Sequence, residues 1–294
     1  MEQTSSLTDS IISTINSIFQ TLFSSIDNSI YSVLDDLVFV NNNILNDSIF
    51  GRLFGNNSSK GILIIANSLL IGFTLYYAIR LVYSYYMNLE VERPFQFIFK
   101  LLVFGICMNC SFFICEYFLQ INGFISDAIR GLGKTIYGHN ISFSELINQL
   151  NSVISIGESD FSIFSFDGLI KSFISVGLFN LIFSYSLRFI MIKVFILLSP
   201  FSFITLINHS TSWFFKTWFR TTISLLLQQS LISIILLIVF SFDFTSNDIL
   251  SKLMYIGGIY ALTRVNSYMR HLIGGISTDV SNNLNLGTYL SKSM

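Results

Sequence analysis

Few residues in this 294-residue chain have types and spacing that could do chemistry. Cys107 and Cys110 have the spacing of half a zinc or redox site, but no histidine or second cysteine pair completes it. Cys115 makes an odd number of cysteines, so no disulfide framework is expected. The histidines lie on separate segments without metal-ligand spacing: His139, His209 and His271.

A phosphate-binding loop is the other candidate motif. The stretch GLGKT (131–135) ends like such a loop, yet Ala128 stands where the first glycine is required, and no strand precedes it. We therefore expect no catalytic site, no metal and no cofactor. The protein is not expected to be an enzyme.

Polar residues inside long apolar stretches carry more information. Arg188 and Lys193 share one such stretch, where an ionisable group either faces protein or water or reaches the headgroups with its long side chain. Both alternatives stay open for these two cations. Gln228 and Gln229 are adjacent in an uncharged stretch and cannot both face the same neighbour, so one is expected to bond to another helix and the other to face a pore or lipid. Interhelical bonding is favoured over pore lining.

Composition indicates the kind of element that carries these residues. The chain is 52% hydrophobic and 11% charged, whereas soluble domains carry roughly 25% charged residues. We expect an all-α, polytopic integral membrane protein. Its start lacks the pattern of a cleaved signal peptide, so internal helices are expected to direct insertion. A net charge of −1 argues against direct, sequence-specific nucleic-acid binding.

Five apolar windows approach the length of about 20 residues that a membrane-spanning helix needs. The third is expected to stop before Pro200 and to form one helix rather than two, because SYSLRFIMIKVF contains no turn residue. The fifth is the shortest, and Gly257, Gly258 and Ala261 suit it for close helix packing. The five predicted transmembrane helices are 61–86, 94–119, 172–198, 221–240 and 249–265.

The basic residues predict the orientation. In this arrangement most of the 16 Lys and Arg residues fall on one side, which the positive-inside rule assigns to the cytoplasm. The N-terminus is then outside and the C-terminus inside the cytoplasmic membrane. Aromatic and cationic residues within the inner segment 200–220 are expected to anchor at the lipid headgroups: Trp213, Lys216, Trp218 and Arg220.

The remaining regions follow from these spans. Residues 1–60 form an extracytoplasmic amphipathic region whose stripe from Leu7 to Leu37 packs against a second copy, packs against the chain's own outer loop, or lies on the outer leaflet. An outer loop with another amphipathic helix, marked by Ile141 and Leu146, follows the first two spans. The predicted division is 1–60, 61–119, 120–167, 168–266 with three spans, and a cytoplasmic tail 267–294.

The order of these features, with the stretches VERPFQFIFKLL, FSFDGLIKSF, KVFILLSPF and WFFKTWF, resembles the TrbL-like polytopic subunit of Gram-positive conjugative type IV secretion systems. The resemblance covers residues 60–270. It implies a homo-oligomeric, pentameric ring in the cytoplasmic membrane that serves as channel or scaffold for DNA transfer. It also implies membrane lipids, secretion ATPases and a bitopic scaffold subunit as partners.

A small-solute transporter or permease subunit is the alternative. Such a protein predicts internal repeats and broken helices around a site at the membrane midplane. The two halves of the chain show no repeat, and Pro200 is the only strong helix breaker in the hydrophobic regions.

Overall fold

A computed structural model describes residues 10–15, 17–18, 28–40, 44–45, 47–55, 61–87, 93–153, 166–242 and 249–274. Every regular element in these ranges is a helix, which confirms the all-α prediction for the described residues. The helices are α2 (Asn28–Val38), α3 (Ser48–Phe54), α4 (Ile62–Met87), α5 (Pro94–Asn109), α6 (Ser111–Tyr137), α7 (Phe143–Val153), α8 (Phe166–Ile204), α9 (Ser212–Val239) and α10 (Ile249–Leu272).

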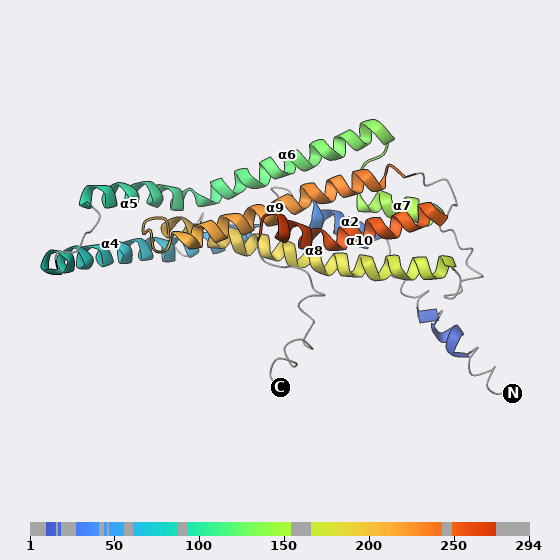
Figure 1. Cartoon of the computed structure of the whole chain (residues 1–294), viewed down its shortest axis with the longest axis horizontal. Helices are drawn as coiled ribbons and strands as arrows, with labels where there is room; N and C mark the ends of the chain where they lie inside the picture. The colour runs from blue at the N-terminus through green and yellow to red at the C-terminus, as the bar shows by residue number, and fades with distance from the viewer. Residues whose placement is uncertain are drawn as a thin grey trace.

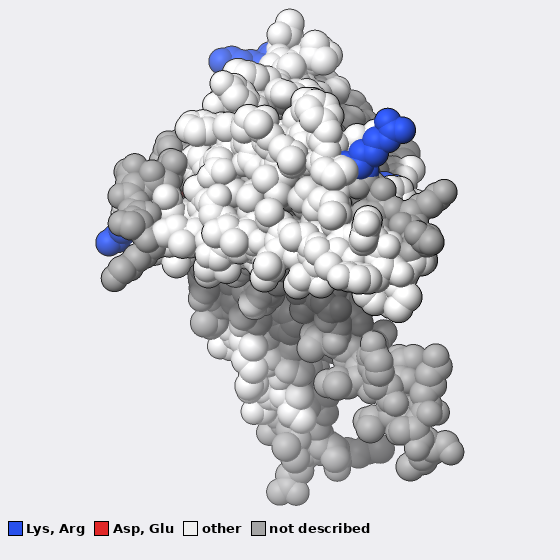
Figure 2. Space-filling model, turned by 90° about the vertical axis from the view of Figure 1, so that its left-hand side faces the viewer, with Lys and Arg blue, Asp and Glu red and all other residues white. Residues whose placement is uncertain are grey.

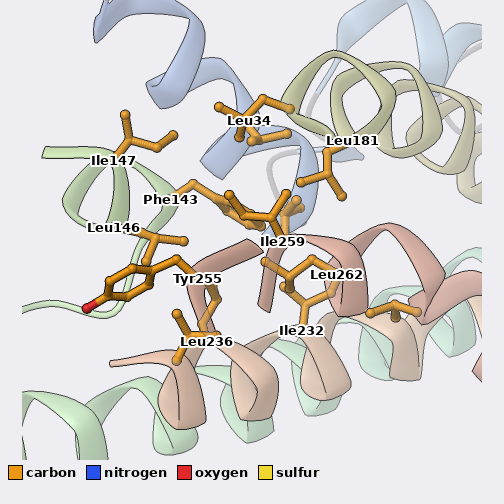
Figure 3. Packing of buried hydrophobic residues seen from close by; sticks show 14 of the residues in the cluster. Leu34, Phe143, Leu146, Ile147, Leu181, Ile232, Leu236, Tyr255, Ile259 and Leu262 are labelled. Atoms are coloured by element: carbon orange, nitrogen blue, oxygen red, sulfur yellow. The ribbon is translucent and has the colours of Figure 1, made fainter. Parts of the chain in front are cut away.

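The helices form an elongated bundle around α9, which packs against α6, α8 and α10 (Figure 1). Two hydrophobic cores follow each other along the bundle. The first joins α2 and α7 to α8, α9 and α10, and Figure 3 shows Leu34, Phe143, Leu236 and Ile259 meeting there. The second joins α3, α4, α5 and the first part of α6 to α8 and to the start of α9. Beyond it, α4 and α5 project together from one end of the molecule (Figure 1).

Three described helices are long and apolar enough to cross a membrane: α4, residues 172–204 of α8, and α9. They indicate a membrane protein. The first, third and fourth predicted spans correspond to these helices, which the prediction exceeds by at most one residue at an end. The helices are covered very differently, because 61% of the most apolar window of α9 is buried inside the chain but only 6% of that of α4.

The second predicted span is broken. Residues 94–119 do not form one helix, because α5 and α6 meet at Cys110 with a bend of 58°. Just before the bend, the Asn109 side chain donates to the carbonyl of Gly105 at 2.8 Å and accepts from Asn67 at 3.4 Å. Asparagine side chains compete in this way with the helical hydrogen bonds, which accounts for a break without proline or glycine.

Helix α6 also continues through residues that were predicted to form a loop. It ends only at Gly138, which adopts a left-handed φ of 75°. Gly133 lies within the helix, and a Cβ there would overlap the side chain of Ile141. That glycine therefore permits close packing rather than a turn. The second amphipathic helix of the region is present as α7.

Helix α8 is continuous through SYSLRFIMIKVF, as predicted, but the prediction that it stops before Pro200 is wrong. Pro200 lies inside the helix, which runs on to Ile204. Proline removes the N–H that would bond to the carbonyl of Ile196. The Ser199 hydroxyl donates to that carbonyl at 2.7 Å, so the backbone oxygen stays satisfied and the helix continues.

The fifth predicted span corresponds to α10, which differs from the others. It is not among the helices apolar enough to cross a membrane. It packs against α8 and α9, and its Lys252 and Asn266 are buried. Those two residues therefore lie within the chain. Among the described helices, three are candidate spans, or four if the bent α5–α6 pair is one span.

Candidate functional site

Arg188 lies at the centre of the bundle and is fully buried. Its Nε donates to the carbonyl of Leu225 in α9 at 2.8 Å, and its Nη1 donates to the carbonyl of Val38 at the end of α2 at 2.9 Å. One turn earlier, Tyr185 donates its hydroxyl to the carbonyl of Leu262 in α10 at 3.0 Å. Arg188 thus faces protein, and the two side chains join α8 to three other helices.

Lys193 occupies a more exposed position. Its ammonium lies 3.4 Å from Oδ2 of Asp47 and 5.3 Å from the ring centroid of Phe189. Asp47 begins α3 by accepting a hydrogen bond from the N–H of Ile49 at 3.0 Å. That hydrogen bond, with the nearby ammonium, lowers the pKa of the Asp47 carboxyl. Arg188 and Lys193 therefore hold consecutive parts of the N-terminal region.

A polar cleft of about 510 Å³ opens between α2, α6 and α8. Asp35, Asp36, Arg130 and Lys193 line it together with aromatic rings. Arg130 stacks 4.1 Å from the ring centroid of Phe39 and donates from Nε to the carbonyl of Ile141 at 2.8 Å. Charges of both signs line the cleft, and Arg130 and Lys193 already have protein partners.

Asp35 connects α2 to the start of α7. Its carboxylate accepts from the N–H of Phe143 at 2.7 Å and from the N–H and hydroxyl of Ser144 at 3.2 and 2.8 Å. Burial raises the pKa of Asp35, and these hydrogen bonds and the charge of Arg130 oppose the rise. The segment 28–38 therefore packs on α7, in the region 120–167 that was predicted to be the outer loop, which is one of the three arrangements considered for it. Residues 7–9, 16 and 19–27 of the stripe lie outside the described residues.

A polar seam runs along α9. Gln229 accepts from the amide of Asn122 in α6 at 3.2 Å, and the hydroxyls of Ser126 and Ser233 lie 2.7 Å apart. On another face of α9, Gln228 donates to Oδ1 of Asn266 in α10 at 2.9 Å. Both glutamines bond to other helices, each to a different neighbour. Neither is placed against lipid, since both are buried.

The predicted headgroup anchors separate into two kinds. Trp213 and Lys216 are exposed on the first turns of α9, and Arg220 is exposed too but donates to the carbonyl of Ile273 at the end of α10. Trp218 is instead buried and donates its indole N–H to the carbonyl of Phe195 at 2.8 Å. The helical period places Trp218 on the inner face of α9, so it packs within the second core.

The small residues of α10 also differ from one another. A Cβ at Gly258 would overlap the side chain of Val239, so Gly258 permits the close approach of α9 and α10. Gly257 faces open space, and Ala261 is half-buried. Only Gly258 of the three makes a close helix contact within the described chain.

The remaining motifs form no assembled site. GLGKT lies inside helix α6, whose backbone N–H groups are engaged in helical bonds and cannot cradle a phosphate. Cys107, Cys110 and Cys115 are free thiols along α5 and α6. In the described ranges, no three His, Cys, Asp or Glu residues are grouped closely enough to hold a metal ion.

Comparisons with known proteins add nothing to this description: no family model, no curated protein and no solved structure matches the chain.

Proposed function

We propose that this chain is a ring-forming channel or scaffold subunit of a conjugative type IV secretion machine in the cytoplasmic membrane. The proposal starts from the sequence resemblance over residues 60–270. The observation that carries it is the exposure of α4, a candidate span with only 6% of its most apolar window buried within its own chain. Lipid and neighbouring copies would cover this helix in a membrane-embedded ring.

The pairing of polar groups inside the chain supports a substrate path between several copies of the chain over a path through one copy. The seam of α9 pairs its glutamines with other helices, and the space beside Cys115 and Phe195 holds only about 10 Å³. The polar cleft of about 510 Å³ lies between α2, α6 and α8, and its cations Arg130 and Lys193 already have protein partners. A central path framed by several copies leaves the packing of each chain intact.

The end of the molecule formed by α4 and α5 supports the proposed orientation. Figure 2 views this end and shows Lys and Arg at its margin, with no acidic side chain among the described atoms in view. Arg80 lies toward the end of α4, and Arg93 immediately precedes α5. Basic residues collect on the cytoplasmic side, so this end would face the cytoplasm, with α2 and α7 toward the outside.

The broken α5–α6 pair favours a second candidate, a small-solute transporter, because transporters use discontinuous helices at their substrate sites. Such a site needs a polar cavity at the break. At the break itself, the Asn109 side chain bonds to the carbonyl of Gly105 and to Asn67, which explains the bend without a substrate site.

Native mass spectrometry of the full chain released from detergent tests the proposal. A pentameric ring is expected, and a strictly monomeric protein would contradict it. Copurification with a secretion ATPase and a bitopic scaffold subunit would identify the machine. Solute uptake by vesicles that contain only this chain, without such partners, would instead establish the transporter.

A further inference from the structure

The longest candidate span is too long for a bilayer. Residues 172–204 of α8 form 33 helical residues. At 1.5 Å per residue they extend about 50 Å, whereas the hydrocarbon core of a bilayer is about 30 Å thick. Tilting the helix by about 40°, the upper end of the usual range, reduces its height only to about 38 Å. One end of α8 must therefore project beyond the hydrocarbon.

Helix α4 indicates which end projects. Only 6% of its most apolar window is buried within the chain, so its surface suits a lipid environment. Residues 62–79 carry no charge, and they extend about 27 Å, close to the thickness of the hydrocarbon. Arg80 follows them and shares a pocket with Tyr77, Ile207 and Asn208. The charged end of α4 thus lies beside the end of α8.

The other end of α4 lies in the second core, where Ala66 is fully buried. A length of about 27 Å covers about 18 residues of helix, and counted back along α8 from Ile207 it reaches about residue 189. A bilayer placed on α4 therefore has its other boundary between Arg188 and Lys193. The ion pair of Lys193 with Asp47 lies at this boundary, where the polar cleft opens onto Lys193.

The first core lies in the projecting part of α8, since Ile174, Leu178 and Leu181 belong to it. Helix α9 enters the same core with Leu236 and Val239, and 61% of its most apolar window is buried within the chain. Contacts within the chain therefore account for the apolar composition of α9 at this level. That composition does not require lipid.

Charged residues occur on the surface around the first core. Asp36 lines the polar cleft, and Asp127 and Lys134 are exposed on α6. This stretch of α6 lies at the level of the first core, because Gly133 packs beside Leu237 of α9. Ionisable groups that face lipid are costly, so this level suits water better than hydrocarbon.

We propose that the bilayer surrounds the second core and that the first core stands outside the hydrocarbon, together with α2, α7 and the adjoining parts of α6, α8, α9 and α10. In the proposed orientation this part is extracytoplasmic. The exposed Phe173 and Val176 of α8 then face a neighbouring copy in the proposed ring rather than lipid chains. The position of the bilayer itself does not depend on the ring or on secretion, so a monomeric protein would show it too.

Fluorescence quenching in lipid vesicles tests this position. The full chain, with its three native cysteines replaced, receives one bimane-labelled cysteine at a time. The labelled positions are all exposed: Ile71 in α4, Leu102 in α5, Leu132 in α6 and Phe173 in α8. Brominated acyl chains should quench the labels at Ile71 and Leu102 but not those at Leu132 and Phe173, and aqueous iodide should quench the label at Leu132.

Two results would overturn the proposal. One is quenching of Leu132 or Phe173 by brominated chains to at least the degree seen at Ile71. The other is a lack of such quenching at both Ile71 and Leu102.

A matched pair of charged variants gives a second test. Ile71→Asp and Leu132→Asp introduce the same charge at apolar positions that are 71% and 57% exposed. Ile71→Asp should reduce the fraction of the full chain that is inserted in the membrane, because it places an ionisable group in hydrocarbon. Leu132→Asp should insert as wild type does. Equal losses in the two variants, or no loss in Ile71→Asp, would contradict the position of the bilayer.

Discussion

Arg188 and Val38 are 150 positions apart in the chain, and Nη1 of the arginine donates to the carbonyl of Val38 at 2.9 Å. A fully buried cation thus holds the end of α2 against the bundle, where Leu34 and Val38 enter the first core. Helix α2 is therefore part of the folded bundle, and α3 joins it through the second core.

Replacing Arg188 should cost far more stability than replacing Lys193. Arg188→Gln removes donors from two carbonyls that lie in the bundle interior, and each buried group left unsatisfied costs about 1–3 kcal/mol. Lys193→Gln breaks a partly exposed ion pair worth about 0–1 kcal/mol. Thermal unfolding in detergent measures both. Similar losses in the two variants would contradict the distinction between their environments.

Asp35 should make the attachment of α7 depend on pH. Because burial raises its pKa above the ordinary value of 3.8, the folded state binds the proton more tightly than the unfolded state. The stabilisation from this difference is fully present below the ordinary pKa and is lost as the pH rises through the raised pKa. Hydrogen exchange at Phe143 and Ser144, corrected for intrinsic rate, should therefore report weaker protection above that pKa.

Asp35→Asn is the control for this titration. The amide cannot ionise, so the pH-dependent part of the protection should disappear. A pH response that persists in the variant would assign it to another group.

The two glutamines of α9 should behave as separate pairs. A double-mutant cycle with Gln229→Leu and Asn122→Leu should give a coupling energy of about 0.6 kcal/mol, the average for interhelical hydrogen bonds in membranes. The cycle of Gln228→Leu with Asn122→Leu should give none, because Gln228 bonds to Asn266. Coupling of equal size in both cycles would contradict the assignment of the two glutamines to different partners.

Surface labelling should establish the proposed orientation. In a cysteine-free background, a single cysteine at Leu53 in α3 should react with an impermeant reagent added outside intact cells, whereas one at Tyr86 should react only after lysis. Both positions are exposed, at 53% and 80%, so access to the reagent decides the outcome. The opposite labelling pattern would place α4 and α5 on the outside.

Local patterns predicted those parts of the fold that local chemistry decides. The absence of turn residues predicted the continuous middle of α8, and apolar periodicity predicted α7. The helix past Pro200 depends on a hydroxyl bond from Ser199, and the break at Cys110 follows the side-chain bonds of Asn109. Polar residues within apolar runs mark such positions, but composition does not show which bond they make.

The site was predicted to a similar extent. Arg188, Lys193, Gln228 and Gln229 were identified as polar residues inside apolar stretches, and all four have polar partners in the structure. Their partners were missed because they are distant in sequence or are backbone carbonyls. Asn122 was missed because residues 120–167 were predicted to be a loop. Asp35 was missed because the stripe from Leu7 to Leu37 was defined by its apolar residues alone.

The bond between Arg188 and Val38 also sets an order for biosynthesis. At about 5–20 residues per second, a ribosome needs about 8–30 s to add the 150 residues that separate them. Throughout this interval Val38 has neither Arg188 nor, still later, α9 to pack against. Helix α2 is thus made before α8 and attached late, and the newly made chain must keep the apolar face of α2 from other partners until α8 and α9 have been made.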